Sequence, residues 1–419
     1  SREEEAVQEI EDSVQRILEA QMSAVRQQLE DEVEEPTTDL DLEYAKTLPY
    51  YTWYDENVDE YVITTARQLF AFNVLCTEDT DYFKGKTVKL GADIDLGANT
   101  TDWAATPEDK IWAPVNFGGT FDGQGHTISG IYLQCTSAGV KGLFGGLGDN
   151  AVIKNLTLEG AVTALAADAE LPALASNGAR GGIACYSTCG TDVVFENIVN
   201  NAAISAIGNL ASDDCAGAII GKFENEAGSV KFINCENNGV ITGMNQVGGI
   251  LGWAKKAASV TFENCVNNGE IKETGSNAYS AGIVCRSDAE LTTFTGCVNN
   301  AKVSSGKDQA GGMIAYASKG AFVFENCVNK GEIAPTVGKA GGLIGKADNG
   351  TAIFDCHNKA SVTALNDGNS GGACGNAMDA YGGGIVGVMS ASTIIGCSNV
   401  GPLRSQFAHN YKIGFAGGI

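Results

Sequence analysis

Apolar and polar residues alternate in a short unit that recurs along the chain from Ile183 onward. One half of the unit reads Gly-Gly-Ile-x-Gly or a close variant, and the other half reads Phe-x-Asn-Cys-x-Asn-x-Gly-x-Ile. Successive copies of the second half are 37, 30, 32, 30, 29 and 41 residues apart. Short alternating runs that are broken by Gly and Asn predict strands joined by tight turns.

A unit of this size cannot bury its apolar face alone, so neighbouring units have to stack on one another. No unit contains a stretch of helical periodicity that is long enough for a helical repeat. Propeller blades of four strands need about 40 residues each and therefore fit less well. The pattern predicts an all-β fold, a parallel β-helix (solenoid) whose coils lie about 4.8 Å apart.

Two positions of the unit are nearly invariant between its copies. Asn stands two residues after the Cys position in every copy, and it can form an amide ladder across stacked coils or present a row of amides to a sugar or an ion. We favour the structural ladder. Its asparagines are Asn200, Asn237, Asn267, Asn299, Asn329, Asn358 and Asn399. The Cys position is occupied by Ile198 in the first copy and then by Cys235, Cys265, Cys297, Cys327, Cys356 and Cys397.

The replacement by Ile198 indicates that the repeat cysteines are small buried apolar residues, since a metal ligand or a disulfide partner would not be replaced in this way. The chain has 13 cysteines. No Cys-x-x-Cys pair with histidine partners is present, so we expect no structural zinc. Cys185 and Cys189 are a separate near pair, for which a disulfide is an open alternative.

The segments that precede the repeat have different patterns. Residues 3–35 carry apolar residues at steps of three and four, which predicts a helix that ends before Pro36. The helix is either a coiled-coil or partner-docking element or, as we prefer, an acidic stalk that lies on its own domain. Thr64 to Phe70 predict a short helix with a threonine cap. We therefore divide the chain into three parts. Residues 1–58 form an acidic helix and an aromatic linker, residues 59–150 form an N-terminal cap with the first coils, and residues 151–419 form the repeat.

Four aromatic residues gather in the linker, at Tyr50, Tyr51, Trp53 and Tyr54. Such a cluster can stack on sugar rings or can seal the end of a domain. We prefer the packing role and keep the cluster as a weak candidate for ligand binding.

The composition narrows the range of partners. The net charge is −24, and residues 1–35 contribute −9 of it from twelve acidic and three basic residues. Nucleic acid and anionic membrane surfaces are unfavourable partners for such a chain, because both are bound through Lys and Arg. No stretch approaches the roughly 20 apolar residues of a membrane helix. The first residues contain no signal peptide and resemble a processed terminus.

Motifs ahead of the repeat carry a family resemblance. Phe117 to Gly130 read Phe-Gly-Gly-Thr-Phe-Asp-Gly-Gln-Gly-His-Thr-Ile-Ser-Gly, and Gly-Leu-Phe-Gly follows at 142–145 and Ile-Lys-Asn-Leu at 153–156. With the Asp-Ile-Asp-Leu stretch from Asp93, the chain from about residue 60 resembles the GLUG-repeat, pectin-lyase-like β-helix proteins on the surfaces of gut bacteria. The resemblance implies a right-handed β-helix, export, frequent lipid anchoring, and roles in adhesion or glycan contact.

Catalytic motifs are sparse in the sequence. Only His126, His357 and His409 are present, and there is no His-Glu-x-x-His, although some members of the family carry a zinc peptidase domain. Carbohydrate-active enzymes need clustered carboxylates. The weak candidates for a binding or catalytic cluster are Asp213 and Asp214. Asp93, Asp95, Asp122 and His126 fit caps and turns better. Paired acids could also bind Ca²⁺, but no calcium loop is present and we assign no cofactor.

The sequence therefore predicts a binding or adhesion protein at the cell surface that contacts a glycan or a host or surface protein. A polysaccharide lyase or glycoside hydrolase on the same scaffold and a structural spacer are the alternatives. A membrane would be reached only through a lipid anchor outside this sequence. Self-association could use residues 3–35 or the C-terminal end. There we expect residues 404–414, with Phe407, His409 and Tyr411, to fold over the last coil.

Overall fold

The structure is a computed structural model. It describes residues 53–78, 83–97, 112, 115–131, 142–160, 162–163, 179–187, 191–206, 215–275, 279–305, 308–335, 338–366, 381–389, 392–407 and 415–417. Residue contacts divide the chain into the units Ser1–Val58 and Asp59–Ile419. The predicted helix over 3–35 lies outside the described residues. No helix in the described part of the chain is long and apolar enough to span a membrane.

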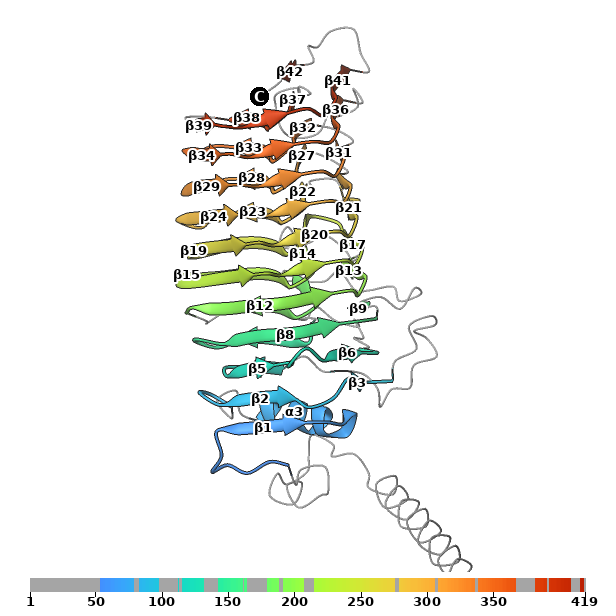
Figure 1. The fold of residues 1–419 in the computed structure, drawn as a ribbon, viewed down its shortest axis with the longest axis vertical. Helices are drawn as coiled ribbons and strands as arrows, with labels where there is room; N and C mark the ends of the chain where they lie inside the picture. Colours follow the sequence, from blue (N-terminus) through green and yellow to red (C-terminus); the bar gives the residue numbers. More distant parts are fainter. Residues whose placement is uncertain are drawn as a thin grey trace, which may run out of the picture. The chain divides into compact units, whose positions relative to one another are not determined.

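The second unit is a parallel β-helix, as the repeat predicts (Figure 1). Its strands pair in parallel with strands of the neighbouring coils. Strand β15 (Ile220–Ile233) pairs with β19 (Leu251–Glu263) so that Phe232 is opposite Phe262. Equivalent positions of successive units are therefore adjacent in space, which is the condition for burying one continuous apolar column.

Three sheets run along the stack. The first eight-stranded sheet contains β10 (Ala179–Gly181), β14 (Cys215–Gly217), β18 (Gln246–Gly248), β22 (Tyr279–Ala281), β27 (Asp308–Gly311), β32 (Gly338–Gly341), β37 (Tyr381–Gly383) and β42 (Phe415–Gly417). The second contains β9 (Val162–Thr163), β13 (Ile204–Ala206), β17 (Ile241–Gly243), β21 (Ile271–Glu273), β26 (Val303–Ser305), β31 (Ile333–Pro335), β36 (Val362–Asn366) and β41 (Leu403–Phe407).

The third sheet has 26 strands and holds the Phe and Asn columns, and each repeat cysteine directly precedes one of its short strands that carry Asn. Besides β15 and β19 it contains β1 (Glu60–Ile63), β2 (Thr87–Leu90), β3 (Ile94–Asp95), β4 (Val115–Phe117), β5 (Thr120–Asp122), β6 (Thr127–Ser129), β7 (Phe144–Leu147), β8 (Val152–Leu158), β11 (Ala184–Ser187), β12 (Val193–Asn200), β16 (Glu236–Asn237), β20 (Val266–Asn267), β23 (Val284–Ser287), β24 (Leu291–Thr295), β25 (Val298–Asn299), β28 (Ile314–Ala317), β29 (Ala321–Glu325), β30 (Val328–Asn329), β33 (Ile344–Ala347), β34 (Thr351–Phe354), β35 (His357–Asn358), β38 (Val386–Met389), β39 (Ser392–Ile395) and β40 (Ser398–Asn399).

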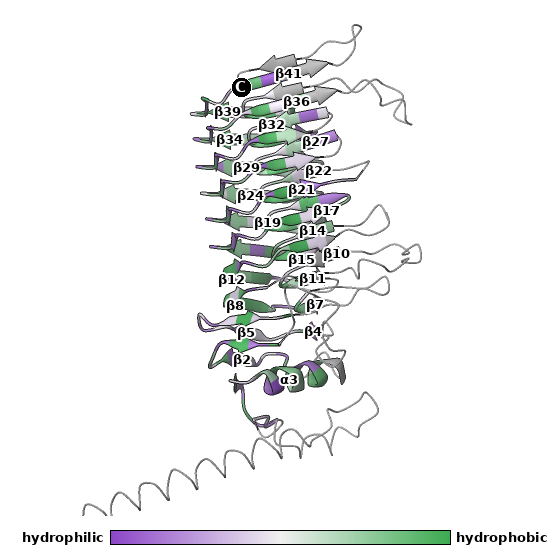
Figure 2. Cartoon of the chain, turned by 90° about the vertical axis from the view of Figure 1, so that its right-hand side faces the viewer, coloured by the Kyte–Doolittle hydropathy of each residue, from purple (hydrophilic) through white to green (hydrophobic). Residues whose placement is uncertain are grey.

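Hydrophobic residues of successive coils lie above one another along the stack (Figure 2), and their buried side chains form columns in the interior. Phe rings of successive coils stack face to face, with centroid separations of 5.2, 5.0, 4.9 and 4.4 Å. The stacked rings are Phe195, Phe232, Phe262, Phe294 and Phe324. Each ring is fully buried, and burying a side chain of this size typically contributes about 1.5–3 kcal/mol.

Helix α3 (Ala66–Glu78) lies beside the first coils (Figure 1) and packs a buried ring, Phe72, against them. The Phe72 centroid lies 5.1 Å from that of Phe83 and 5.6 Å from that of Phe117. The helix begins as predicted, since the Thr65 hydroxyl accepts a hydrogen bond from the Gln68 amide. It continues eight residues past the predicted end, because its apolar residues, Phe72 among them, are buried at the first coils.

The structure corrects two expectations at the C-terminal side. Residues 404–407, which we expected in a covering loop, belong to strand β41, where Leu403 pairs with Val362 of β36. The remainder of that segment, 408–414, lies outside the described residues. Cys397, expected to be buried like the other repeat cysteines, is only half-buried, because within the described residues no strand pairs with β39 on its other side.

Candidate functional site

A row of alternating aromatic and cationic side chains crosses five coils of the 26-stranded sheet. Strand register places its members side by side. We call it the aromatic–cationic row, and it consists of Lys222, Trp253, Arg286, Tyr316 and Lys346. Cations attract the negative face of an aromatic ring. The alternation therefore lets each ring contact cations from the coils on both sides.

The geometry within the row supports these contacts. The guanidinium carbon of Arg286 lies 4.9 Å from the Trp253 ring centroid and 5.3 Å from the Tyr316 centroid. The Lys222 Nζ lies 5.6 Å from the Trp253 centroid, and the Lys346 Nζ lies 4.9 Å from that of Tyr316. Trp253 is only 6% exposed. Its ring faces are therefore used within the protein and are not free to stack on a sugar.

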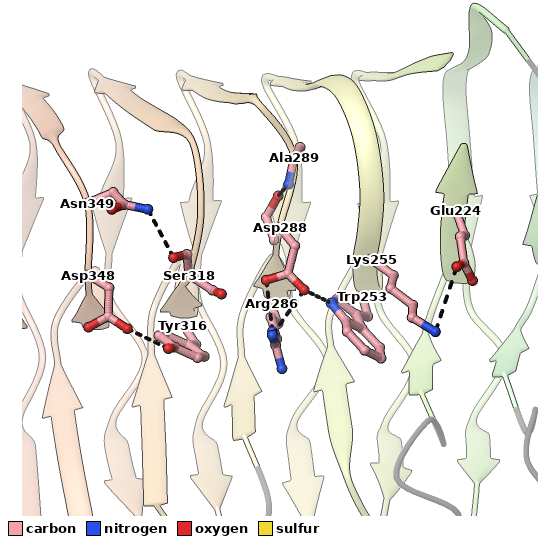
Figure 3. Close-up of polar contacts among 11 residues, drawn as sticks. Glu224, Trp253, Lys255, Arg286, Asp288, Ala289, Tyr316, Ser318, Asp348 and Asn349 are labelled. Carbon is pink, nitrogen blue, oxygen red and sulfur yellow. Dashed lines mark hydrogen bonds and ion pairs between the residues drawn. The ribbon is translucent and has the colours of Figure 1, made fainter. Parts of the chain in front are cut away.

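Asp288 fixes the centre of the row (Figure 3). Its Oδ1 accepts a hydrogen bond of 3.0 Å from Arg286 Nε, and its Oδ2 lies 3.0 Å from Arg286 Nη2. The same Oδ2 accepts a hydrogen bond of 3.1 Å from Trp253 Nε1. The Asp288 side chain is 7% exposed. Both of its oxygens are engaged, so Asp288 orients Arg286 and Trp253.

A second carboxylate holds the neighbouring part of the row (Figure 3). Asp348 pairs with Lys346 at 2.8 Å and accepts a hydrogen bond from the Tyr316 hydroxyl. Partial burial alone would raise the pKa of Asp348, but the hydrogen bonds from Lys346 and Tyr316 outweigh it and hold the pKa below its usual value. Burial, together with the Asp348 charge, raises the pKa of Tyr316. Asp348 therefore remains ionised and Tyr316 remains a hydrogen-bond donor over the physiological pH range.

A cavity of about 530 Å³ opens beside Trp253 and Arg286. We call it the Trp253 cavity, and its lining residues are Glu226, Trp253, Lys255, Lys256, Ala257, Arg286, Asp288, Glu290 and Lys319. Its size is within the range of small-molecule sites. Four basic and three acidic side chains meet there, which gives the lining a net charge of +1 in a chain of −24.

The charged groups of the Trp253 cavity differ in how they are paired. Lys256 lies 3.0 Å from Glu226, whose hydrogen bond raises the pKa of the lysine. Lys255 lies 3.7 Å from Glu224, a residue outside the lining. Among the described residues, the side chains of Lys319 and Glu290 have no ion-pair or hydrogen-bond partner. The cavity therefore contains one cation and one carboxylate that are available to a ligand.

None of the residues proposed as sites from the sequence is among the described lining residues of the Trp253 cavity. Asp213, Asp214, Tyr50 and Tyr51 fall outside the described residues. Trp53 and Tyr54 are half-buried, and their rings meet edge to face at 6.2 Å. Whether these residues bind a ligand stays a prediction.

The acidic residues near the first coils hold turns. Asp93 Oδ1 accepts a hydrogen bond of 2.9 Å from the Thr127 amide and lies 3.1 Å from His126 Nδ1. These contacts lower the pKa of Asp93. Asp95 accepts a hydrogen bond from the Gly97 amide, and Asp122 accepts one from the Gln124 amide. In the described part of the chain, no group of three or more His, Cys, Asp or Glu side chains is arranged to hold a metal ion.

The repeat asparagines form a continuous amide ladder. Each side-chain Nδ2 donates to the Oδ1 of the next asparagine, from Asn200 to Asn399, at 2.7 to 2.9 Å. The Oδ1 of Asn200 has no partner, because Leu158 occupies the equivalent position of the preceding coil. The repeat thiols lie beside the Phe column, where Cys265 Sγ donates to the Phe232 carbonyl oxygen at 3.4 Å.

Sequence reasoning missed the aromatic–cationic row, although a signal for it exists. The fifth residue after the first position of each Gly-Gly-Ile half reads Lys, Trp, Arg, Tyr and Lys in five successive units. The position escapes notice because its residues differ in every unit. It becomes visible only when the register places those residues next to one another.

Comparisons with known proteins give short or distant likenesses. No model of a known protein family matches the chain. Halomucin from Haloquadratum walsbyi is 32% identical over an alignment of 116 residues that covers 25% of this chain, and the chain spans about 1% of the length of that protein. A solved structure from Bacteroides ovatus, titled "putative immunoglobulin A1 protease", aligns with this chain at 19% identity and a TM-score of 0.44. The alignment covers 64% of this chain and 75% of the other.

Proposed function

We propose that the chain is an extracellular binding protein of the GLUG-repeat type that contacts a glycan or a surface protein through the outer face of its β-helix. The observation that carries this proposal is the Trp253 cavity, which gathers ordered polar groups beside a rigid row of side chains. The β-helix provides a stable support on which such a site can be pre-organised. The stretch shared with halomucin supports a location at the cell surface.

The competing enzymatic function is a polysaccharide lyase or glycoside hydrolase, and one observation favours it. The Trp253 cavity contains three carboxylates together with Lys and Arg, which are the groups such enzymes use. However, Asp288 is engaged through both oxygens, and Glu226 is paired with Lys256. Glu290 remains as the single lining carboxylate without a partner, whereas hydrolysis of a glycosidic bond by the acid–base route needs two. We therefore favour binding without turnover.

The third function, a structural spacer, requires no ordered cavity. A spacer would be expected to present polar side chains that are independent of one another, as on an ordinary soluble surface. Arg286 is instead fixed by Asp288 and enclosed between two rings. Fixing a side chain in this way costs conformational entropy. This arrangement favours a recognition function over a spacer.

The experiment is a glycan-array screen of the 419-residue chain, followed by incubation of every bound glycan with the protein. We expect reproducible binding to a restricted set of glycans, with no increase in reducing ends and no unsaturated-uronate absorbance. Asp213→Ala and Glu290→Gln serve as variants in the turnover assay. Turnover that either variant abolishes would assign the chain to the enzymes instead. A chain that binds no glycan and no surface protein would contradict the binding function.

A further inference from the structure

We propose that the Trp253 cavity binds the carboxylate of an acidic sugar. The inference rests on the proposed binding function and specifies its ligand. It begins from the local charge, because four cations and three carboxylates line the cavity while the whole chain carries −24. A concave, locally basic surface on an acidic protein attracts an anion to that place and repels it elsewhere.

Two groups can hold a carboxylate. The Lys319 ammonium is exposed and has no partner among the described residues, so it can meet an anion without breaking an existing pair. Arg286 uses Nε and Nη2 on Asp288, which leaves Nη1 for a ligand. The guanidinium is enclosed between Trp253 and Tyr316, so its direction is set before a ligand arrives. Charge-assisted hydrogen bonds from Lys and Arg to a carboxylate are about twice as strong as neutral ones.

The acidic groups of the cavity favour a sugar over an acidic peptide. A peptide with several carboxylates would meet repulsion from Glu226 and Glu290, both of which are exposed. A sugar carries hydroxyl groups beside its carboxylate, and a free carboxylate such as that of Glu290 accepts hydrogen bonds from hydroxyls. Cations and carboxylates in one cavity therefore complement a ligand that combines one negative charge with several hydroxyl donors. Uronic and sialic acids share this chemistry.

The test is isothermal titration calorimetry of the 419-residue chain with matched probes. The probes are tetragalacturonic acid, the same tetrasaccharide with methyl-esterified carboxyl groups, and sialyllactose. We expect at least one acidic probe to bind. If the uronate binds, the esterified form should bind at least about tenfold more weakly, which corresponds to about 1.4 kcal/mol for the lost charge. Binding of sialyllactose alone would identify sialic acid as the source of the carboxylate.

The variants locate the binding at the cavity. Lys319→Ala should lower the affinity for the acidic probe by about tenfold, and Lys319→Glu should lower it further. Lys330→Ala removes an exposed lysine that is outside the cavity lining, and it should leave the affinity unchanged. Because Lys319 is exposed, its substitution should not disturb folding, and circular dichroism spectra should confirm this.

Each remaining outcome identifies which proposal fails. Equal affinity for the acidic and esterified probes, or an acidic probe that binds Lys319→Glu as well as the unchanged protein, would overturn the carboxylate site. Array binding restricted to neutral glycans would also overturn it, while the general binding function would stand. A chain that binds no ligand in the array or the calorimeter would overturn the binding function together with the site.

Discussion

At the scale of single residues, asparagine solves a problem that arises from stacking identical coils. A buried polar side chain must find a partner for each of its groups, and Asn has both a donor and an acceptor. In the ladder, Asn299 Nδ2 donates to Asn329 Oδ1 and to the Ala301 carbonyl, while its Oδ1 accepts from Asn267. The requirement is met only when every coil supplies the same residue, which explains why the position repeats.

Replacement of Asn299 by alanine should therefore destabilise the stack. Asn267 Nδ2 would lose an acceptor and Asn329 Oδ1 a donor in a site from which water is excluded. Leaving buried polar groups unpaired typically costs about 1–3 kcal/mol. Urea denaturation followed by circular dichroism measures the loss. Binding of the acidic probe should not change, since Asn299 does not line the Trp253 cavity.

The next residue in the sequence provides a matched control. Asn300 belongs to an outer ladder, in which its Nδ2 donates to Asn268 Oδ1 at 2.7 Å, but it is exposed and water can replace the bond. Asn300→Ala should change stability by less than about 0.5 kcal/mol, as is usual for surface positions. An equal loss in both variants would show that burial of the inner ladder is not the source of its stabilising effect.

At the scale of elements, the cysteine column illustrates how burial controls reactivity. Burial raises the pKa of the thiols of Cys265, Cys297 and Cys397. Cys265 and Cys297 are fully buried, whereas Cys397 is half-buried. The thiolate is the reactive form, so both burial and a raised pKa protect a cysteine from modification.

Thiol labelling of the native chain should therefore proceed in order along the column. Iodoacetamide at neutral pH should modify Cys397 first and leave Cys235, Cys265, Cys297, Cys327 and Cys356 unmodified, as peptide mass mapping would show. In urea, all should react. A Cys397→Ser variant shows whether the early reaction belongs to that residue. Rapid labelling of several of the other five under native conditions would contradict a closed interior column.

The elements also show which parts of this fold can be predicted. Positions that face the interior repeat because packing restricts them, so Phe232, Cys235 and Asn237 identify the strands and the parallel register. The aromatic–cationic row lies outside the repeating Phe, Cys and Asn columns, and its residue type changes from coil to coil, so Trp253 and Arg286 are not alike in the sequence. Side chains about thirty residues apart in the sequence become neighbours only because one coil has that length. The neighbourhood of Trp253 and Arg286 could therefore be recognised only in the structure.

At the scale of the β-helix, the first coils and the last described coil differ in how well their apolar side chains are covered. The first coils pack against α3 through Phe72, whose ring is buried by Phe83, Phe117, Phe121 and Phe144. In the last described coil, by contrast, Ile395 is 57% exposed and Val400 is 74% exposed. Stability in a stacked protein is approximately a sum of coil and interface terms. A coil with one described interface therefore has fewer stabilising terms than a coil with two.

Hydrogen exchange of the 419-residue chain should therefore show a gradient along the stack. Amides of β39 and β40 should exchange first, since their local opening exposes little additional apolar surface. Amides of β19 and β24, which have paired strands on both sides, should be protected longest. Mass spectrometry of peptides resolves the order, and Phe262→Ala should accelerate exchange in β19 and β24 more than in β1. Equal protection of all coils would instead show that the solenoid opens only as one cooperative unit, with interface energies far larger than the differences between coils.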